Sequence, residues 1–224
     1  MRTPGTRFSF GLMVCASLCV LLHGCEKKDA GGFKETRVPV KTSLPPGTDP
    51  TQARKLTFAQ FASIPDPPEV LKNDPRYDKA RIPAFANSLG VKEGDVVKVG
   101  GYLQVVTYMG DGDYNLRFTA TPDSPDNYIV SEVPDDDDLA DKKLRPLVIA
   151  ARDALKAQAL GGKDPSKQGS KPTTPPYMEI TGQLYFSDNH VGDVPAPDRQ
   201  GLHRASSWQI HPGLYISFPA KPTQ

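Results

Sequence analysis

Alternating apolar and polar positions fill much of the second half of the chain, and this spacing of two is typical of strands. Five segments rich in β-branched and aromatic residues predict strands at residues 96–108, 114–119, 128–133, 178–186 and 208–218. The first contains Gly100–Gly101, and glycines inside a strand indicate bending or close approach of another backbone. Helical spacing over residues 139–160, ended by Gly161–Gly162, predicts a helix between the third and fourth strands.

This order predicts a mainly β domain, a small five-stranded OB-fold-like barrel with one helix between strands 3 and 4. A long, bent first strand can pair at both of its ends and so close a small barrel. The intervening helix would then cover the open end of that barrel. A small open β-sandwich has the same number of strands and is the alternative.

The first half of the chain has weaker periodicity. Residues 25–50 are rich in Lys, Gly, Pro and Thr, which predicts a flexible tether. Residues 51–93 form a helical or irregular extension, with short N-terminal helices expected at 56–64 and 79–89. The OB-fold-like domain is expected to occupy residues 94–224.

The N-terminus has the features of a secretion signal over residues 1–24. Arg2 and Arg7 form a short positive region, and the uncharged apolar run that follows, residues 8–22, is too short to span a bilayer comfortably. The string Leu22-His23-Gly24-Cys25 follows, and it resembles the lipobox of bacterial lipoproteins. That resemblance implies lipidation of Cys25 and attachment to a membrane in the cell envelope. Because Glu26 and not Asp follows, it also implies the outer membrane, facing the periplasm. An ordinary signal peptide with an incidental Cys25 is the alternative.

Composition narrows the classes of function. The chain carries 27 basic and 26 acidic side chains, so it lacks the overall positive charge typical of nucleic-acid binding. All three cysteines (Cys15, Cys19 and Cys25) lie in the leader or at its end. The domain that follows therefore has no disulfide, no cysteine zinc site and no cysteine nucleophile.

Four short strings occur in the predicted strands or beside them: GDGDYNLRF, IVSEVP, ITGQLYFSDNH and WQIHP. Together, over residues 94–218, they resemble an OB-like family of bacterial proteins that are often uncharacterised. Two positions depart from the family's pattern, since Asn115 stands where it has His and Gln209 where it has Glu. The resemblance implies a fold and no specific activity.

Polar residues of these strings form a candidate cluster at the rim of the barrel: Asp113, Asn115, Glu132, Asp188, His190, His203 and His211. The preferred interpretation is a structural hydrogen-bond network, because such side chains commonly satisfy exposed backbone groups at strand ends. The alternative is a metal site built from Asp188, His190 and His211, whose bound water would become a nucleophile. Both interpretations place these three side chains close together, because the fourth strand ends near the start of the fifth.

Three further motifs have structural interpretations. Asp111-Gly112-Asp113 resembles a segment of the thermonucleases, but the following residues lack that family's acidic pattern, so a hairpin turn is expected. The acidic run 135–138 is expected to begin the helix, whose N-terminus favours carboxylates. Trp208, the sole tryptophan, is expected in the core.

Two classes of function follow. The first is a lipid-anchored, non-enzymatic binding module for a peptide, a glycan or an envelope protein, with no cofactor and no nucleic acid. Its ligand face would draw on Tyr102, Gln104, Tyr114 or Arg117. The alternative is a metal-dependent hydrolase that uses the Asp and His residues.

Overall fold

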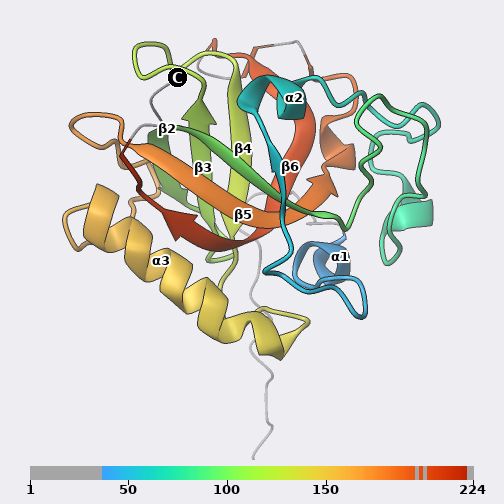
Figure 1. The fold of residues 1–224 in the computed structure, drawn as a ribbon, viewed down its shortest axis with the longest axis horizontal. Helices are drawn as coiled ribbons and strands as arrows, with labels where there is room; N and C mark the ends of the chain where they lie inside the picture. Colours follow the sequence, from blue (N-terminus) through green and yellow to red (C-terminus); the bar gives the residue numbers. More distant parts are fainter. Residues whose placement is uncertain (1–36, 195–196, 199–200, 221–224) are drawn as a thin grey trace, which may run out of the picture.

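The computed structural model describes residues 37–194, 197–198 and 201–220 (Figure 1). One sheet contains the strands β1 (Arg54–Leu56), β2 (Val96–Tyr108), β3 (Tyr114–Thr119), β4 (Tyr128–Val133), β5 (Tyr177–Phe186) and β6 (Arg204–Ser217). The α-helices are α1 (Val38–Lys41), α2 (Phe58–Ala62) and α3 (Arg145–Ala159). Short 3₁₀ turns lie at Pro75–Tyr77, Lys142–Leu144 and Asp188–His190. The expected signal peptide, Cys25 and residues 26–36 lie outside the described residues.

Five of the strands close into a barrel, as the strand pattern predicts. Their order around it is β2–β3–β4–β6–β5, and β5 pairs again with β2. The β4–β6 pair is parallel and the other pairs within the barrel are antiparallel. Strand β1 lies outside the ring and pairs in parallel with the first half of β2. The closing β2–β5 pair excludes the open sandwich.

Strand β2 closes the barrel by pairing along both of its halves. Its first half pairs with β5 and its second half with β3, the two ladders meeting at Tyr102. Both glycines lie where neighbouring groups approach closely. A Cβ on Gly101 would lie 2.7 Å from the Phe118 ring, and one on Gly100 would collide with the Tyr177 hydroxyl. The predicted close approach is therefore confirmed.

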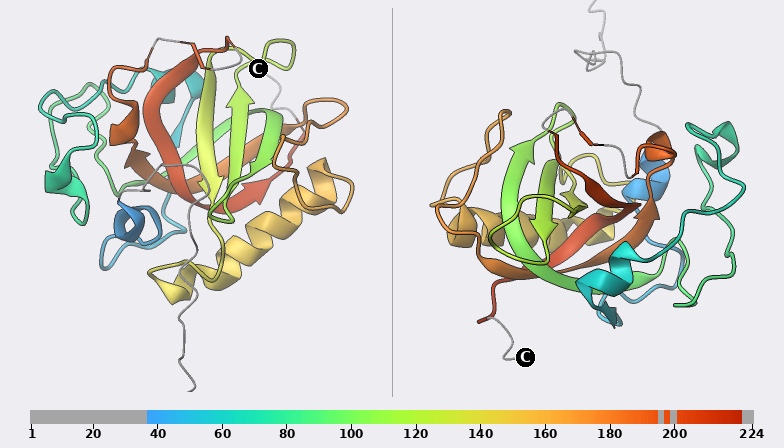
Figure 2. Two further views of the ribbon diagram at one scale, coloured as in Figure 1. Left: turned by 180° about the vertical axis from the view of Figure 1, so that it is seen from behind. Right: turned by 90° about the horizontal axis from the view of Figure 1, so that it is seen from above.

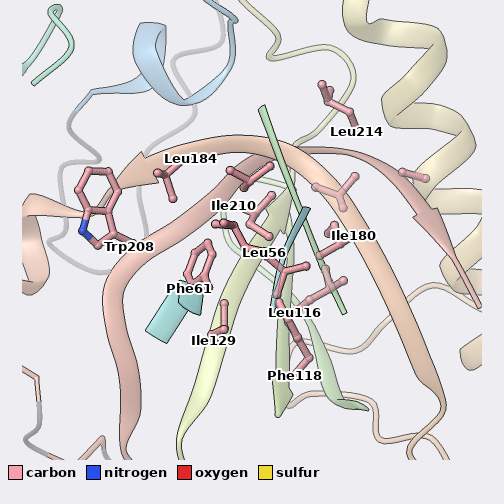
Figure 3. Packing of buried hydrophobic residues seen from close by; sticks show 14 of the residues in the cluster. Leu56, Phe61, Leu116, Phe118, Ile129, Ile180, Leu184, Trp208, Ile210 and Leu214 are labelled. Atoms are coloured by element: carbon pink, nitrogen blue, oxygen red, sulfur yellow. The ribbon is translucent and has the colours of Figure 1, made fainter. Parts of the chain in front are cut away.

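Alternate side chains of the barrel strands point inward and form the core (Figure 3). Leu116, Leu184 and Ile210 are fully buried there. Phe61 of α2 joins the same cluster (Figure 3). Trp208 is also buried, as expected, and its indole N–H donates a 3.0 Å hydrogen bond to the carbonyl of Pro65.

Helix α3 begins later than the sequence pattern predicts. A 3₁₀ turn over Lys142–Leu144 comes first, capped by the carboxylate of Asp141, and Pro146 in the first turn suits a helix start at Arg145. The acidic run 135–138 therefore does not begin the helix. Instead, Asp136 forms a 2.9 Å ion pair with the side chain of Arg145.

Helix α3 lies beside the barrel and below β5 and β6 in Figure 1. Its buried side chains, Val148, Ala151 and Leu155, recur at helical spacing and form its apolar face. Among the described residues, no helix has both the length and the apolar character needed to cross a bilayer.

The N-terminal part differs from expectation in two places. Residues 79–89 form no helix, because Pro83 interrupts the segment and the Asn87 side chain bonds to the backbone of Val91 instead. Residues 37–50, assigned to the flexible tether, lie against the barrel, with Arg37 and Val40 buried. The expected tether is therefore wrong for this part of the range.

Candidate functional site

The outer face of β4 and β6 carries a group of buried polar side chains. Trp208 and Ile210 point into the core, so His211 projects to the opposite face of β6, as expected. In the view from behind, β6, β4 and β3 lie side by side, with α1 next to them (Figure 2). Gln183 of β5 joins α1 to this face, because its amide donates to the carbonyls of Val40 and His211.

Asp113, Glu132 and His211 meet at this face, and we call them the acidic–histidine cluster. One potential ligand atom from each lies within 4.8 Å of the others. The Nδ1 atom of His211 is 3.0 Å from Glu132 Oε2, and its Nε2 atom is 3.6 Å from Asp113 Oδ2. His211 is completely buried, and neither ring nitrogen has a hydrogen-bond partner of acceptable geometry among the described residues.

Two neighbours hold Glu132 in place. Asn115 lies directly opposite it in the β3–β4 ladder and donates a 2.7 Å hydrogen bond to Oε1. Lys41, the last residue of α1, places its ammonium 3.3 Å from Oε2. Both carboxylate oxygens of Glu132 therefore have a positively polarised partner.

Burial and neighbouring charge shift the pKa values of the acidic–histidine cluster. Burial raises the pKa of Asp113 to about 8, and the charge of Glu132 adds to that rise. Burial would also raise the pKa of Glu132, but the ammonium of Lys41 holds it well below its usual range. Burial, with Lys41 nearby, lowers the pKa of His211. Near neutral pH, Asp113 therefore holds a proton, Glu132 is charged and His211 is neutral.

A small cavity of about 200 Å³ adjoins the acidic–histidine cluster. Its lining consists of Val38, Lys41, Thr42, Asp111, Asp113 and Asp138. Asp113 belongs to both the lining and the cluster, so the cavity leads to the buried carboxylates. The carboxylates of Asp111 and Asp138, together with the carboxyl group of Asp113, outnumber the single ammonium of Lys41, and this balance favours a cation in the space.

A larger cavity of about 390 Å³ lies between residues 45–54 and the start of β2. Charged side chains of both signs line it, among them Asp49, Arg54, Lys92 and Asp95. This mixture of charges does not select a ligand class.

The structure separates three predicted cluster members from His211. Asp188 accepts a hydrogen bond from the backbone N–H of Asp74, and so shapes a loop. His190 lies 3.2 Å from Asp193, and His203 lies 3.1 Å from Asp126. Among the described residues, the one group of three potential metal ligands is Asp113, Glu132 and His211. The alternative metal set of Asp188, His190 and His211 is therefore not brought together, and these three side chains do not make the expected contact.

Strand register explains this separation. Trp208 pairs with Phe186 at the end of β5, so the end of the fourth barrel strand does lie near the fifth, as argued. His211, however, is three residues further along β6, which is roughly 10 Å at about 3.3 Å per residue. The acidic–histidine cluster forms instead across the β4–β6 pair, where Ser131 lies opposite Ile210.

Sequence reasoning missed Lys41 and two carboxylates of the small cavity, Asp111 and Asp138. The composition of residues 25–50 predicts a tether that includes Lys41. No local pattern indicates that this lysine pairs with Glu132, which lies 91 residues further along the chain. Asp111 was assigned to the hairpin turn that it does form, with Gly112 at a positive φ of 94°.

One of the four expected ligand-face residues is not available to a ligand. Tyr114 is buried, whereas Tyr102, Gln104 and Arg117 remain partly exposed.

Comparison of the chain with family models, with curated proteins and with solved structures gave no match.

Proposed function

We propose that this protein is a lipid-anchored envelope protein whose OB-fold-like barrel binds an extended ligand and catalyses no reaction. The observation that carries the binding role is the strand order β2–β3–β4–β6–β5 with its parallel β4–β6 pair. A five-stranded barrel of this order, with a helix between its third and fourth strands, is what we mean by OB-fold-like.

The ligand face of an OB-fold lies on its second and third strands and the adjoining loops, which are β3 and β4 in this chain. The outer face of β3 carries Arg117, whose guanidinium lies 4.7 Å from the ring centre of Tyr128 on β4. Asp198, from the loop between β5 and β6, binds both side chains at 2.8 and 2.9 Å. Tyr128 is buried beneath this pair, so the partly exposed charged groups of Arg117 and Asp198 are the ones that would contact the polar groups of a peptide or a glycan strand.

We favour binding over hydrolysis because the hydrolase alternative required Asp188, His190 and His211 together. Those residues have separate partners, so the hydrolase lacks the residue set on which it was based.

The anchor is proposed from the resemblance of Leu22–Cys25 to a lipobox. Bacteria expressing the full chain should incorporate labelled palmitate into it, and the Cys25→Ser variant should incorporate none. Cys19→Ser is the matched control and should label like the original chain. An unlabelled original chain would refute the anchor.

Binding is tested with purified sacculi, which contain both glycan strands and short peptides. The chain should cosediment with them, and Arg117→Ala should reduce the bound fraction severalfold. Lys98→Ala, a partly exposed position on β2, is the control and should leave it unchanged. Failure of the original chain to cosediment would contradict a role at the cell wall.

A further inference from the structure

The acidic–histidine cluster contains a buried imidazole with unused hydrogen-bonding capacity. His211 is fully buried, yet within the described part of the chain neither ring nitrogen has a hydrogen-bond partner of acceptable geometry, although Nδ1 lies 3.0 Å from Glu132 Oε2. Leaving such a group unsatisfied is costly, so buried side-chain nitrogens normally find a partner. The Nδ1 atom faces Glu132 and the Nε2 atom faces Asp113, and a cation bound to one of these nitrogens can also be reached by both carboxylates, because one ligand atom from each residue lies within 4.8 Å of the others.

The spacing supports this interpretation. The 3.6 Å between His211 Nε2 and Asp113 Oδ2 is too long for a hydrogen bond. Two ligands at zinc bond lengths of about 2.1 Å, in tetrahedral array, lie roughly 3.4 Å apart. Closing the remaining separation to Glu132 needs a small movement, because all three ligand atoms already lie within 4.8 Å.

We propose that Asp113, Glu132 and His211 bind one divalent transition-metal cation, which enters through the small acidic cavity. One imidazole and two carboxylates form a donor set suited to zinc and its neighbours among the transition metals. Asp111 and Asp138, in the cavity lining, attract the cation toward the cluster. Because Asp113 also lines the cavity, water or a ligand could reach a cation bound there.

Lys41 is the competitor in this arrangement. Its ammonium lies 3.3 Å from Glu132 and supplies the positive charge that a metal would supply. Binding of the cation requires Lys41 to leave Glu132, and its side chain is 9% exposed at the edge of the cavity. Removing this ammonium should therefore strengthen metal binding, which damage to a purely structural network would not do.

The test is calorimetric titration of the purified full chain with Zn²⁺ after treatment with a chelator. We expect one ion per chain. Asp113→Asn should weaken binding by about tenfold or more. Its Oδ1 can still accept the 2.9 Å hydrogen bond from the Asp135 N–H, so the variant is expected to fold. Lys41→Met should tighten binding.

The double variant His190→Gln/His203→Gln is the control for adventitious binding, because both histidines pair with exposed aspartates. It should bind zinc like the original chain. The proposal is overturned if the original chain binds no zinc, if Asp113→Asn binds equally well, if Lys41→Met binds more weakly, or if the double variant abolishes binding. The proposal is independent of the binding of sacculi.

Discussion

Two buried polar groups hold the segment from Arg37 to Lys41 against the barrel, and they differ in how completely they are satisfied. At one end of the segment, Arg37 and Glu93 form an ion pair of 2.6 Å with both side chains fully buried. Glu93 also accepts backbone N–H groups from Ile82 and Phe186 at 2.7 and 3.0 Å. We call this pair the arginine clamp.

The acidic–histidine cluster, at the other end, has polar atoms without a hydrogen-bond partner among the described residues, whereas the arginine clamp has none on Arg37. Arg37 in the clamp also donates to the carbonyls of Tyr77, Ala80 and Phe186, so each of its nitrogens has a partner. In the cluster, Lys41 and Asn115 serve Glu132, while the nitrogens of His211 lack hydrogen bonds. A buried group whose polar atoms are all hydrogen-bonded is typical of a structural element. A buried polar atom without a hydrogen-bond partner suggests a place for a ligand.

The largest expected effect is on the arginine clamp. Arg37→Met should lower the free energy of unfolding by about 3–5 kcal/mol, because it leaves Glu93 buried and without its counterion. Urea unfolding followed by the fluorescence of Trp208 measures this loss. The control is Lys55→Met, since Lys55 is 76% exposed and 3.8 Å from Glu179, and its effect should stay below about 0.5 kcal/mol. A loss below about 1 kcal/mol for Arg37→Met would show that the clamp is not structural.

The second largest expected effect is a pH dependence of the free energy of unfolding, which Asp113 of the acidic–histidine cluster causes. The pKa of Asp113 is raised to about 8 in the folded protein, whereas an unfolded aspartate titrates near 4. The folded state therefore keeps a proton that the unfolded state releases. The stabilisation that comes from keeping this proton is fully present below about pH 4 and is lost as pH rises toward 8. Asp113→Asn mimics the protonated form and removes this dependence.

With a chelator present, the original chain should lose stability relative to Asp113→Asn between pH 4 and 8. The full rise of the pKa by about four units would correspond to roughly 5–6 kcal/mol at about 1.4 kcal/mol per unit. Because Asp113 titrates together with Glu132, we expect a smaller difference, on the order of 2 kcal/mol. Urea unfolding at several pH values measures it. Parallel stability curves for the two proteins would mean that Asp113 is ionised throughout.

Much of the barrel could be predicted because its signals are local. Alternation within each strand and the Gly100–Gly101 pair depend on neighbouring residues, and β2, β3 and β4 have the predicted bounds. The helix starts later than the sequence predicts. The acidic run 135–138 has the composition of a helix cap, but Asp141 and Pro146 determine the actual start.

The candidate site was only partly predictable because it depends on pairing between distant segments. Asp113, Asn115 and Glu132 come together through one hairpin, which the strand pattern already implies. His211 joins them through the parallel β4–β6 pair, and Lys41 through the packing of α1. Neither register nor the docking of a four-residue helix leaves a signal in local sequence.

The smallest expected effect concerns Asn115, at the exposed side of the acidic–histidine cluster. Its 2.7 Å hydrogen bond to Glu132 is charge-assisted, but the side chain is only partly buried, so water can replace it in a shortened variant. Asn115→Ala should therefore lower the free energy of unfolding by about 0.5–1.5 kcal/mol. Asn115→Asp, which places a second carboxylate beside Glu132, should cost more than Asn115→Ala at pH 7 and lose that excess when the pH is lowered. If Asn115→Asp and Asn115→Ala lower the free energy of unfolding by equal amounts at both pH values, residue 115 does not sense the charge of Glu132.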